Sequence, residues 1–290
     1  MRFATYTKQD YQAVIDFLVA LNQDQKDHIN WNWARFEWMM AHPEFHSEYE
    51  NLIGLWWNQD KVVAAAIFDM YPGEASCLVL PAYQHLFAEV LDYAERTLGD
   101  EEGLAIAFNE NDEEGIAEAA RRGYISTGNK ETVMSVCLDD LPETNSPFIR
   151  LEPFDPGDDP EGFFWLMWQG FDHGSDYQEF KENTRKPLQK APHFKKSLSI
   201  SALNESGERV AYCCLWHDSR TDYVYVEPVC VIPSYRGKGV GKAVVLEALL
   251  RARKEGAKTA YVISDMAFYQ KLGFAETAHY RFCKLTKERA

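Results

Sequence analysis

Residues 231–242 constrain this chain more than any other segment. They read Val-Ile-Pro-Ser-Tyr-Arg-Gly-Lys-Gly-Val-Gly-Lys, with glycines at 237, 239 and 241. An apolar, strand-like run (223–232) leads into them, and an amphipathic stretch (242–255) follows. Because glycine has no Cβ, the chain can turn tightly here and approach a ligand closely. The pattern therefore predicts a strand, a glycine loop and a helix in direct succession.

The beginning of such a helix suits an anion. Its first N–H groups have no partner within the helix, and the helix dipole places partial positive charge there. Arg236, Lys238 and Lys242 add formal positive charge. We therefore expect this loop to bind a phosphate or a pyrophosphate group.

Two common phosphate motifs do not fit the segment. The P-loop needs Ser or Thr after Gly-Lys, but Ala243 follows Lys242. The dinucleotide motif G-x-G-x-x-G needs a different glycine spacing. Arg236, Gly239 and Gly241 instead form Arg-x-x-Gly-x-Gly, which resembles the coenzyme A pyrophosphate loop of the GNAT superfamily of N-acetyltransferases. The structural alternative is a glycine-rich turn that only packs a helix on a strand.

A second segment strengthens this resemblance. After a short apolar strand (259–263), residues 267–274 read Ala-Phe-Tyr-Gln-Lys-Leu-Gly-Phe. They look like the family's second signature, a Tyr on a short helix followed by a Gly-Phe turn, with a final strand at 279–285. The resemblance implies an α/β fold of the α+β kind, a twisted mixed sheet flanked by helices. Two parallel strands would splay apart to admit the pantetheine arm.

The first half of the chain reads as a second copy of the same unit. Residues 51–68 and 198–216 both predict a hairpin, and Val-Leu-Pro-Ala-Tyr-Gln at 79–84 parallels 231–236. Gly123-Tyr124 likewise parallels Gly273-Phe274. We therefore expect two tandem GNAT-like domains.

The first copy lacks the residues that would carry the chemistry. The four residues after Gln84 include no glycine, and Ala119 stands where the second copy has Tyr269. We expect residues 1–140 to be a degenerate GNAT-like domain without a coenzyme loop. A linker rich in helix breakers would span 141–148, and residues 149–290 would form the catalytic domain.

The resemblance also implies roles for individual residues. Tyr269 matches the family's acid that protonates the leaving thiolate; the alternative is that it only packs against or orients the sulfur. The coenzyme would be held by residues at the end of the strand, in the loop and after the next strand. These are Val229, Cys230, Val231, Arg236, Gly237, Lys238, Gly239, Val240, Gly241, Lys242 and Ser264. Ser264 stands where the family often has Asn.

Glu227 is the candidate general base. It interrupts an apolar strand, where a buried carboxylate needs a reason. Many family members carry a Glu eleven residues before the loop's first Arg or Gln, but that position here is Tyr225. Because positions 225 and 227 share one face of a strand, Glu227 is expected to reach the pocket. The alternatives are that it binds the substrate's ammonium group or caps backbone amides, with water as the base.

Charge and composition limit the kinds of molecule that this chain is expected to bind. Residues 1–148 hold 9 Lys and Arg against 26 Asp and Glu, whereas residues 149–290 hold 21 against 19. The net charge of −15 argues against nucleic-acid binding. The acidic first part favours a cationic substrate through its long-range field, and the alternative is that its carboxylates only maintain solubility. No apolar run approaches a membrane span, and the N-terminus lacks the apolar region of a signal peptide. All six cysteines lie in apolar, strand-like contexts, so we expect reduced core thiols, a cytoplasmic protein and no metal site.

The sequence thus predicts a transferase: an acetyl-CoA-dependent N-acetyltransferase with acetyl-CoA as cosubstrate. Its acceptor would be the primary amine of a small cationic molecule. Two alternatives remain, an acetyltransferase for protein or peptide amines and a non-catalytic acetyl-CoA-binding protein. The two fused copies are compatible with a monomer that forms an internal pseudo-dimer, or with a homodimer.

Overall fold

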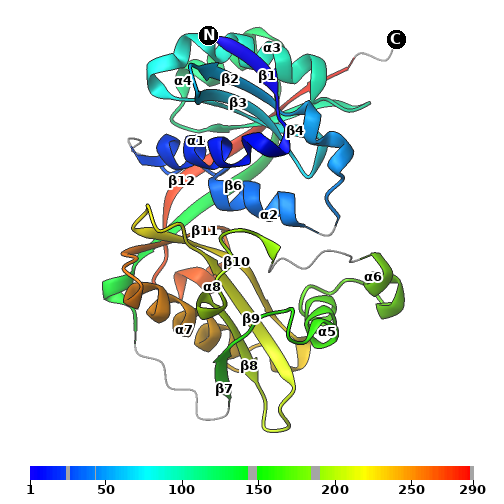
Figure 1. The fold of residues 1–290 in the computed structure, drawn as a ribbon, viewed down its shortest axis with the longest axis vertical. Helices are drawn as coiled ribbons and strands as arrows, with labels where there is room; N and C mark the ends of the chain where they lie inside the picture. Colours follow the sequence, from blue (N-terminus) through cyan, green and yellow to red (C-terminus); the bar gives the residue numbers. More distant parts are fainter. Residues whose placement is uncertain (24–26, 43, 143–148, 184–189, 288–290) are drawn as a thin grey trace. The chain divides into compact units, whose positions relative to one another are not determined.

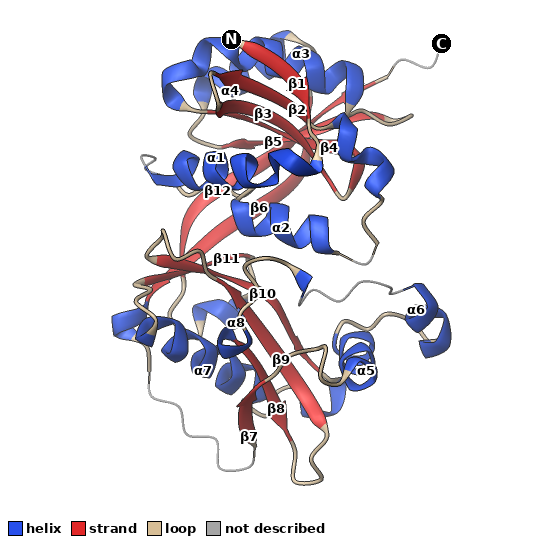
Figure 2. Cartoon of the chain, viewed as in Figure 1, coloured by secondary structure: helices blue, strands red, loops and turns tan. Residues whose placement is uncertain are grey.

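The computed structural model describes residues 1–23, 27–42, 44–142, 149–183 and 190–287. The chain divides into two compact units (Figure 1). Unit 1 consists of Met1–Met39, Phe45–Val133 and Thr277–Ala290, and unit 2 consists of Met40–Glu44 and Met134–Glu276. Each unit combines helices with a mixed sheet, which confirms the predicted α/β fold class (Figure 2).

Unit 1 has the strand order β1-β2-β3-β4-β5-β12-β6. Its strands are β1 (Arg2–Thr5), β2 (Gly54–Asn58), β3 (Lys61–Asp69), β4 (Tyr71–Val79), β5 (Gly103–Asn109), β6 (Ile125–Cys137) and β12 (Ala275–Thr286). Its helices are α1 (Tyr11–Gln23), α2 (Trp33–Ala41), α3 (Phe87–Thr97) and α4 (Glu113–Arg121), with short 3-10 turns η1 (Lys8–Asp10), η2 (Ser47–Leu52) and η3 (Pro81–Leu86).

Unit 2 has the strand order β6-β11-β10-β9-β8-β7 and begins with the last residues of β6. Its further strands are β7 (Arg150–Pro153), β8 (Ser199–Leu203), β9 (Arg209–Trp216), β10 (Tyr223–Val231) and β11 (Thr259–Ile263). Its helices are α5 (Pro160–Gly170), α6 (Tyr177–Asn183), α7 (Val240–Lys254) and α8 (Ala267–Gln270), with 3-10 turns η4 (Leu138–Asp140), η6 (Lys196–Leu198) and η7 (Pro233–Tyr235).

The predicted repeat is visible in the order of elements. In both copies a hairpin precedes a third strand, a 3-10 turn, a long helix, a parallel strand, a short helix and a last strand. The third strand and the strand after the long helix pair in parallel, β4 with β5 and β10 with β11. The two halves therefore carry the same local plan.

Apolar content explains which strands are central. The run Val62–Phe68 of β3 is entirely buried, as expected for a strand covered on both faces. Figure 1 shows α1 and α3 on opposite sides of this strand. In unit 2, α7 buries eight of its residues, including Val244, Leu246 and Leu249, and packs on β8 and β9. Each sheet thus has helices to cover it.

The last strand of the chain belongs to unit 1. β12 pairs antiparallel with β5 from Tyr280↔Asn109 to Thr286↔Gly103. Its Tyr280 is buried, and the phenol hydroxyl donates to the His28 carbonyl at 3.0 Å. The expected domains, 1–140 and 149–290, differ from the compact units in the position of this strand. The expected second domain included it, whereas the structure places it in unit 1. Residues 143–148 of the expected linker lie outside the described residues.

All six cysteines are free thiols. Cys213, Cys214, Cys230 and Cys283 are buried, as expected of core thiols, and Cys77 is half-buried. Cys137 was expected in the core but is exposed, because it ends β6 with its side chain on the solvent side. Among the described helices, none combines the length and apolarity that crossing a bilayer requires.

Candidate active site

The two parallel strands of unit 2 separate partway along their length. β10 pairs with β11 at Tyr223↔Thr259, Val224↔Ala260 and Tyr225↔Tyr261. From there to Val231, no strand of the described residues pairs with that edge. Its other edge stays paired with β9, with a register shift between Val226 and Val229. The resemblance implied such a splay.

Successive residues of β10 direct their backbone N–H and C=O groups alternately to the two sides of the strand. The Ile232 N–H donates to the Val210 carbonyl on the β9 side at 3.0 Å. Because alternate residues of an antiparallel pair bond to the same neighbour, the backbone groups of Val229 and Val231 face the open edge. These are the two residues expected to bond the pantetheine amides.

The glycine loop beyond β10 is open to solvent. Gly237 and Gly239 have positive φ values of 74° and 81°, a region that favours glycine. A Cβ built on either glycine would meet no atom within 4 Å. The loop therefore leaves free space beside its backbone, which a diphosphate group can enter.

The loop ends at the N-terminus of α7. Gly239 is the N-cap, and its carbonyl accepts the first helical bond from the Ala243 N–H at 3.0 Å. The N–H groups of Val240, Gly241 and Lys242 precede that bond and have no helical acceptor. The exposed side chains of Lys238 and Lys242 add positive charge. These donors and cations fit the pyrophosphate of coenzyme A.

Gly241 brings three elements together. A Cβ at this position would lie 3.1 Å from Val231 Cγ2 and 3.3 Å from Phe268 Cε2. The end of β10, the start of α7 and the short helix α8 therefore meet at this glycine. The structure thus gathers the predicted loop, the predicted strand end and the neighbourhood of Tyr269 in one place.

Tyr269 lies on α8 with its ring buried. The ring centroids of Phe268 and Phe274 lie 5.0 Å and 5.5 Å from that of Tyr269. Burial raises the pKa of Tyr269 well above its ordinary value of 10, and the nearby Cys213 and Glu227 raise it further. Among the described residues none hydrogen-bonds to the phenol hydroxyl. The group keeps its proton at neutral pH and is therefore available as a proton donor.

Glu227 lies close enough to Tyr269 to raise the pKa of the phenol, but Glu227 is not buried. The expectation of a buried carboxylate was wrong: Glu227 is exposed, between the buried Val226 and Pro228. The register shift in β10 at this point turns the side chain away from the core. Its backbone carbonyl accepts from Trp216 Nε1 at 2.8 Å, which fixes the strand beside β9.

Arg236 is bound to the protein itself. Its Nε donates to the Val231 carbonyl at 3.0 Å, Nη2 donates to the Gly170 carbonyl at 2.9 Å, and Nη1 contacts Asp172 Oδ2 at 3.0 Å. Sequence reasoning placed this guanidinium at a phosphate. The structure shows it holding the end of α5 to the end of β10.

Two further predicted residues have structural partners. The Ser264 hydroxyl accepts the Met266 N–H at 3.2 Å and so shapes the entry into α8. Cys230 is buried, and burial raises the pKa of its thiol to about 12. Its Cβ and Sγ leave no room at Gly170, where a Cβ would lie 2.7 Å and 2.8 Å from them.

Sequence reasoning assigned no role in the site to Gly170 and Cys213. Gly170 ends α5 and allows that helix to approach β10, while Asp172 pairs with Arg236. Cys213 lies on β9 near Tyr269 and Glu227. A glycine at the end of an apolar helix was the one available signal, since the pairings depend on the tertiary fold.

Known proteins resemble this chain in sequence and in fold. The model of the acetyltransferase (GNAT) family matches residues 160–274. A mycothiol acetyltransferase from Saccharomonospora viridis is 27% identical over 224 residues, which cover 69% of this chain and 70% of that protein. A glucosamine 6-phosphate N-acetyltransferase from Trypanosoma brucei brucei is 39% identical over 64 residues, 21% of this chain and 42% of that protein.

Solved structures match nearly the whole chain. A tandem GNAT protein from the clavulanic acid biosynthesis pathway has a TM-score of 0.65 at 14% identity, covering 100% of this chain and 99% of its own. A GCN5-related N-acetyltransferase from Sphaerobacter thermophilus has a TM-score of 0.63 at 15% identity, covering 98% and 95%. The tandem fold predicted from the repeat is confirmed. Residues 160–274, which hold the splayed strand β10, the glycine loop and Tyr269, are thus the part of this chain that matches the GNAT family of acetyltransferases.

Proposed function

We propose that unit 2 transfers the acetyl group of acetyl-CoA to the primary amine of a small, cationic molecule. The observation that carries this proposal is the open loop from Gly237 to Lys242. It combines free space, unpaired helix N–H groups and two lysines at the edge where β10 has no strand partner. Such a combination fits a nucleotide-linked pyrophosphate with an extended arm.

The acceptor class is supported by relatives and by charge. The two relatives named above act, by their names, on mycothiol and on glucosamine 6-phosphate, which are small molecules. The chain's net charge of −15 attracts cations over a distance of several ångströms. Together these points favour a small ammonium compound as acceptor.

The chain's own groups divide the work of the transfer. Backbone N–H groups of α7 would hold the pyrophosphate, and the backbone of Val229 and Val231 would hold the pantetheine arm. When bound, acetyl-CoA supplies the activated acetyl thioester. Glu227 would accept a proton from the incoming ammonium, directly or through water, so that a neutral amine is present. Tyr269 would donate its proton toward the departing sulfur.

A covalent route through a cysteine is disfavoured. The nucleophile in such a route is the thiolate. Burial raises the pKa of Cys230 and of Cys214 to about 12, and that of Cys213 is raised as well. These thiols stay protonated at neutral pH, so direct attack by the amine is the simpler route.

The test is thiol release from acetyl-CoA with a panel of polyamines, amino sugars, amino acids and short peptides. We expect turnover with a small ammonium compound and its loss in Gly239→Glu, whose carboxylate would enter the pyrophosphate space. Gly207→Glu is a matched control, because Gly207 has the same positive φ of 82° and the same empty surroundings in the β8–β9 turn.

Each other result would contradict the proposal. Turnover with peptides alone would replace the small-molecule acceptor by a protein one. Acetyl-CoA binding without turnover for any amine would favour a non-catalytic role. An equal loss in Gly239→Glu and Gly207→Glu would remove the loop from coenzyme binding.

A further inference from the structure

Unit 1 contains its own cavity at the place where its parallel strands part. β4 and β5 pair at Glu74↔Ala105 and Ala75↔Ile106. Beyond these pairs, Ser76–Val79 and Ile106–Asn109 line a cavity of about 660 Å³. Every residue that lines it belongs to unit 1. The degenerate copy has therefore kept an open space between its central strands.

The cavity is unsuited to a coenzyme A pyrophosphate. In place of a glycine loop, the chain forms the 3-10 turn η3, whose Gln84 carbonyl accepts the Phe87 N–H at the start of α3. The Phe87 N–H, at the first position of α3, is therefore already engaged. Among the described lining residues there is no Lys, Arg or His, whereas four are acidic: Asp27, Asp112, Glu113 and Glu114. An anion would be repelled here.

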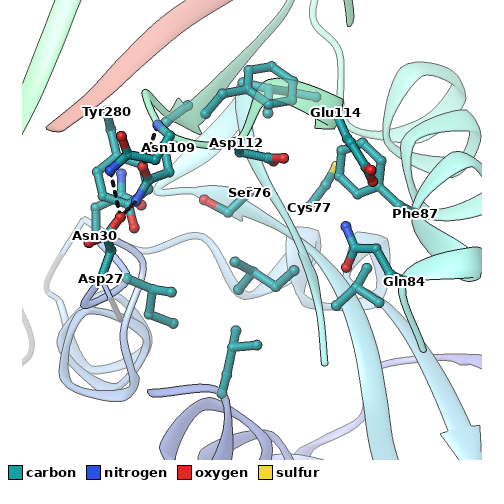
Figure 3. A pocket seen from close by; sticks show the side chains of 18 of the residues that line it. Asp27, Asn30, Ser76, Cys77, Gln84, Phe87, Asn109, Asp112, Glu114 and Tyr280 are labelled. Carbon is teal, nitrogen blue, oxygen red and sulfur yellow. Dashed lines mark hydrogen bonds between the residues drawn. The ribbon is translucent and has the colours of Figure 1, made fainter. Parts of the chain in front are cut away.

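One acidic end of the cavity is held in a fixed arrangement. Asp27 Oδ2 accepts from Asn111 Nδ2 at 2.8 Å and from Asn109 Nδ2 at 3.3 Å. Asn30, on the same side, is buried and oriented by its bond to Glu131 at 2.7 Å. Figure 3 shows Asp27, Asn30, Asn109 and Tyr280 grouped together. The result is a carboxylate held in place near the aromatic ring of Tyr280, an environment that attracts an ammonium group.

A second carboxylate lies on another side of the cavity. Figure 3 places Glu114 near Gln84 and Phe87, away from Asp27, with Ser76 between the two groups. The lining of the cavity also includes apolar side chains, among them Ile29, Leu78 and Ile106. A short aliphatic chain can lie along this surface while its two ends meet the two carboxylates.

We propose that the unit 1 cavity is a binding site for a small aliphatic diamine or polyamine. The site is separate from the coenzyme loop of unit 2 and does not require it. Cation binding at both ends gives selectivity for two ammonium groups over one, and the apolar strip between them sets the preferred chain length.

Calorimetric titration of the full chain with cadaverine tests the proposal. We expect saturable binding, weaker binding of n-pentylamine, which has one ammonium group, and none of 1,5-pentanediol, which has the same length and no charge. Asp27→Asn with Glu114→Gln should weaken cadaverine binding about tenfold, since two attractive charges are lost. Asp60→Asn with Glu101→Gln removes the same charge from exposed positions outside the cavity and should change little.

Steric closure gives an independent reading. Ser76→Trp should fill the cavity and abolish binding, while Ser126→Trp places the same side chain on an exposed strand residue. Melting temperatures of all variants identify any that fail to fold, in which case the charge variants decide. Equal affinities of the wild type and both sets of cavity variants would overturn the proposal, as would equal binding of cadaverine and 1,5-pentanediol.

The coenzyme-loop variant separates this site from the proposed function. Gly239→Glu should lose acetyl-CoA binding and keep cadaverine binding. If Gly239→Glu still bound acetyl-CoA and Ser76→Trp did not, the cavity would be a coenzyme site and the diamine proposal would fall.

Discussion

At the scale of single residues, the most informative group is the Tyr269 hydroxyl. Tyr269 is buried among aromatic rings, the pKa of its phenol is raised, and no described residue hydrogen-bonds to the hydroxyl. Tyr269→Phe should lower kcat by about 10²-fold, in the usual range for a lost proton donor, with little change in the KM for acetyl-CoA. Steady-state kinetics measure this. Tyr261→Phe, which removes a phenol on β11, should leave kcat near wild type; an unchanged kcat in Tyr269→Phe would exclude the acid role.

The exposed Glu227 makes a different prediction. If its carboxylate takes the proton from the amine, kcat/KM should fall at acidic pH as that carboxylate becomes protonated. Glu227→Gln should lower kcat/KM near neutral pH and flatten the acid limb of the profile. A control is Glu205→Gln, which removes an exposed charge from the β8–β9 turn. Identical acid limbs in Glu227→Gln and wild type would assign proton removal to water.

Glu74 in unit 1 links stability to pH. Burial raises its pKa from 4.5 to about 7, with Asp69 adding to the rise and Arg35 opposing it. The folded carboxyl therefore binds its proton more tightly than the unfolded one. The resulting stability is fully present below pH 4.5 and is lost as pH rises through 7.

Glu74→Gln should remove this dependence. The free energy of unfolding of Glu74→Gln, taken relative to that of wild type, should be higher at pH 8 than at pH 4.5 by about 1–2 kcal/mol. This figure is reduced from the full pKa shift because the side chain is partly exposed. Denaturant unfolding at several pH values measures the difference, with Glu101→Gln as an exposed control. Parallel stability curves for wild type and Glu74→Gln would refute the assignment.

At the scale of elements, the packing of α5 on β10 depends on Gly170. In an open helix position, Gly→Ala would stabilise the fold by up to about 1 kcal/mol. Here the new Cβ would lie 2.7 Å from Cys230 Cβ, so Gly170→Ala should destabilise unit 2 by about 1–3 kcal/mol. Denaturant unfolding measures whether Gly170→Ala raises or lowers the free energy of unfolding. A stabilised variant would mean that α5 is free to move away from β10.

The elements around the site differ in how far the sequence predicts them. The strand, loop and helix at 223–254 follow from local rules: apolar runs, glycines without Cβ and an amphipathic period. The partners of Arg236 do not, because Gly170 and Asp172 come from a helix far away in sequence. The exposure of Glu227 depends on a register shift within β10. The apolar residues around Glu227 give no sign of this shift in the sequence.

At the scale of the whole molecule, one pairing escaped sequence reasoning. The repeat predicted two similar copies, and both are present. Periodicity identifies β12 as a strand but carries no information on its neighbour, and it lies beside β5 in unit 1. Unit 1 is therefore formed from two distant parts of the chain.

This arrangement predicts how fragments behave. A fragment of residues 1–140 lacks β12, so the edge of β5 is left without its partner over seven residue pairs. We expect no cooperative thermal transition from this fragment. Appending residues 275–287 through a flexible Gly/Ser linker should restore one, whereas a scrambled sequence of equal composition should not. Cooperative unfolding of residues 1–140 alone, followed by circular dichroism, would show that β12 is dispensable.

The position of β12 also sets the timing of folding during synthesis. A ribosome releases β1 to β6 long before residues 275–286 emerge, so the first unit must wait with an open strand edge while the second is made. Unpaired edges are aggregation-prone, and domains that depend on late segments gain little from being translated first. Unit 2, whose core strands and helices arise from one nearly continuous stretch, is the part that can fold while its predecessor is still incomplete.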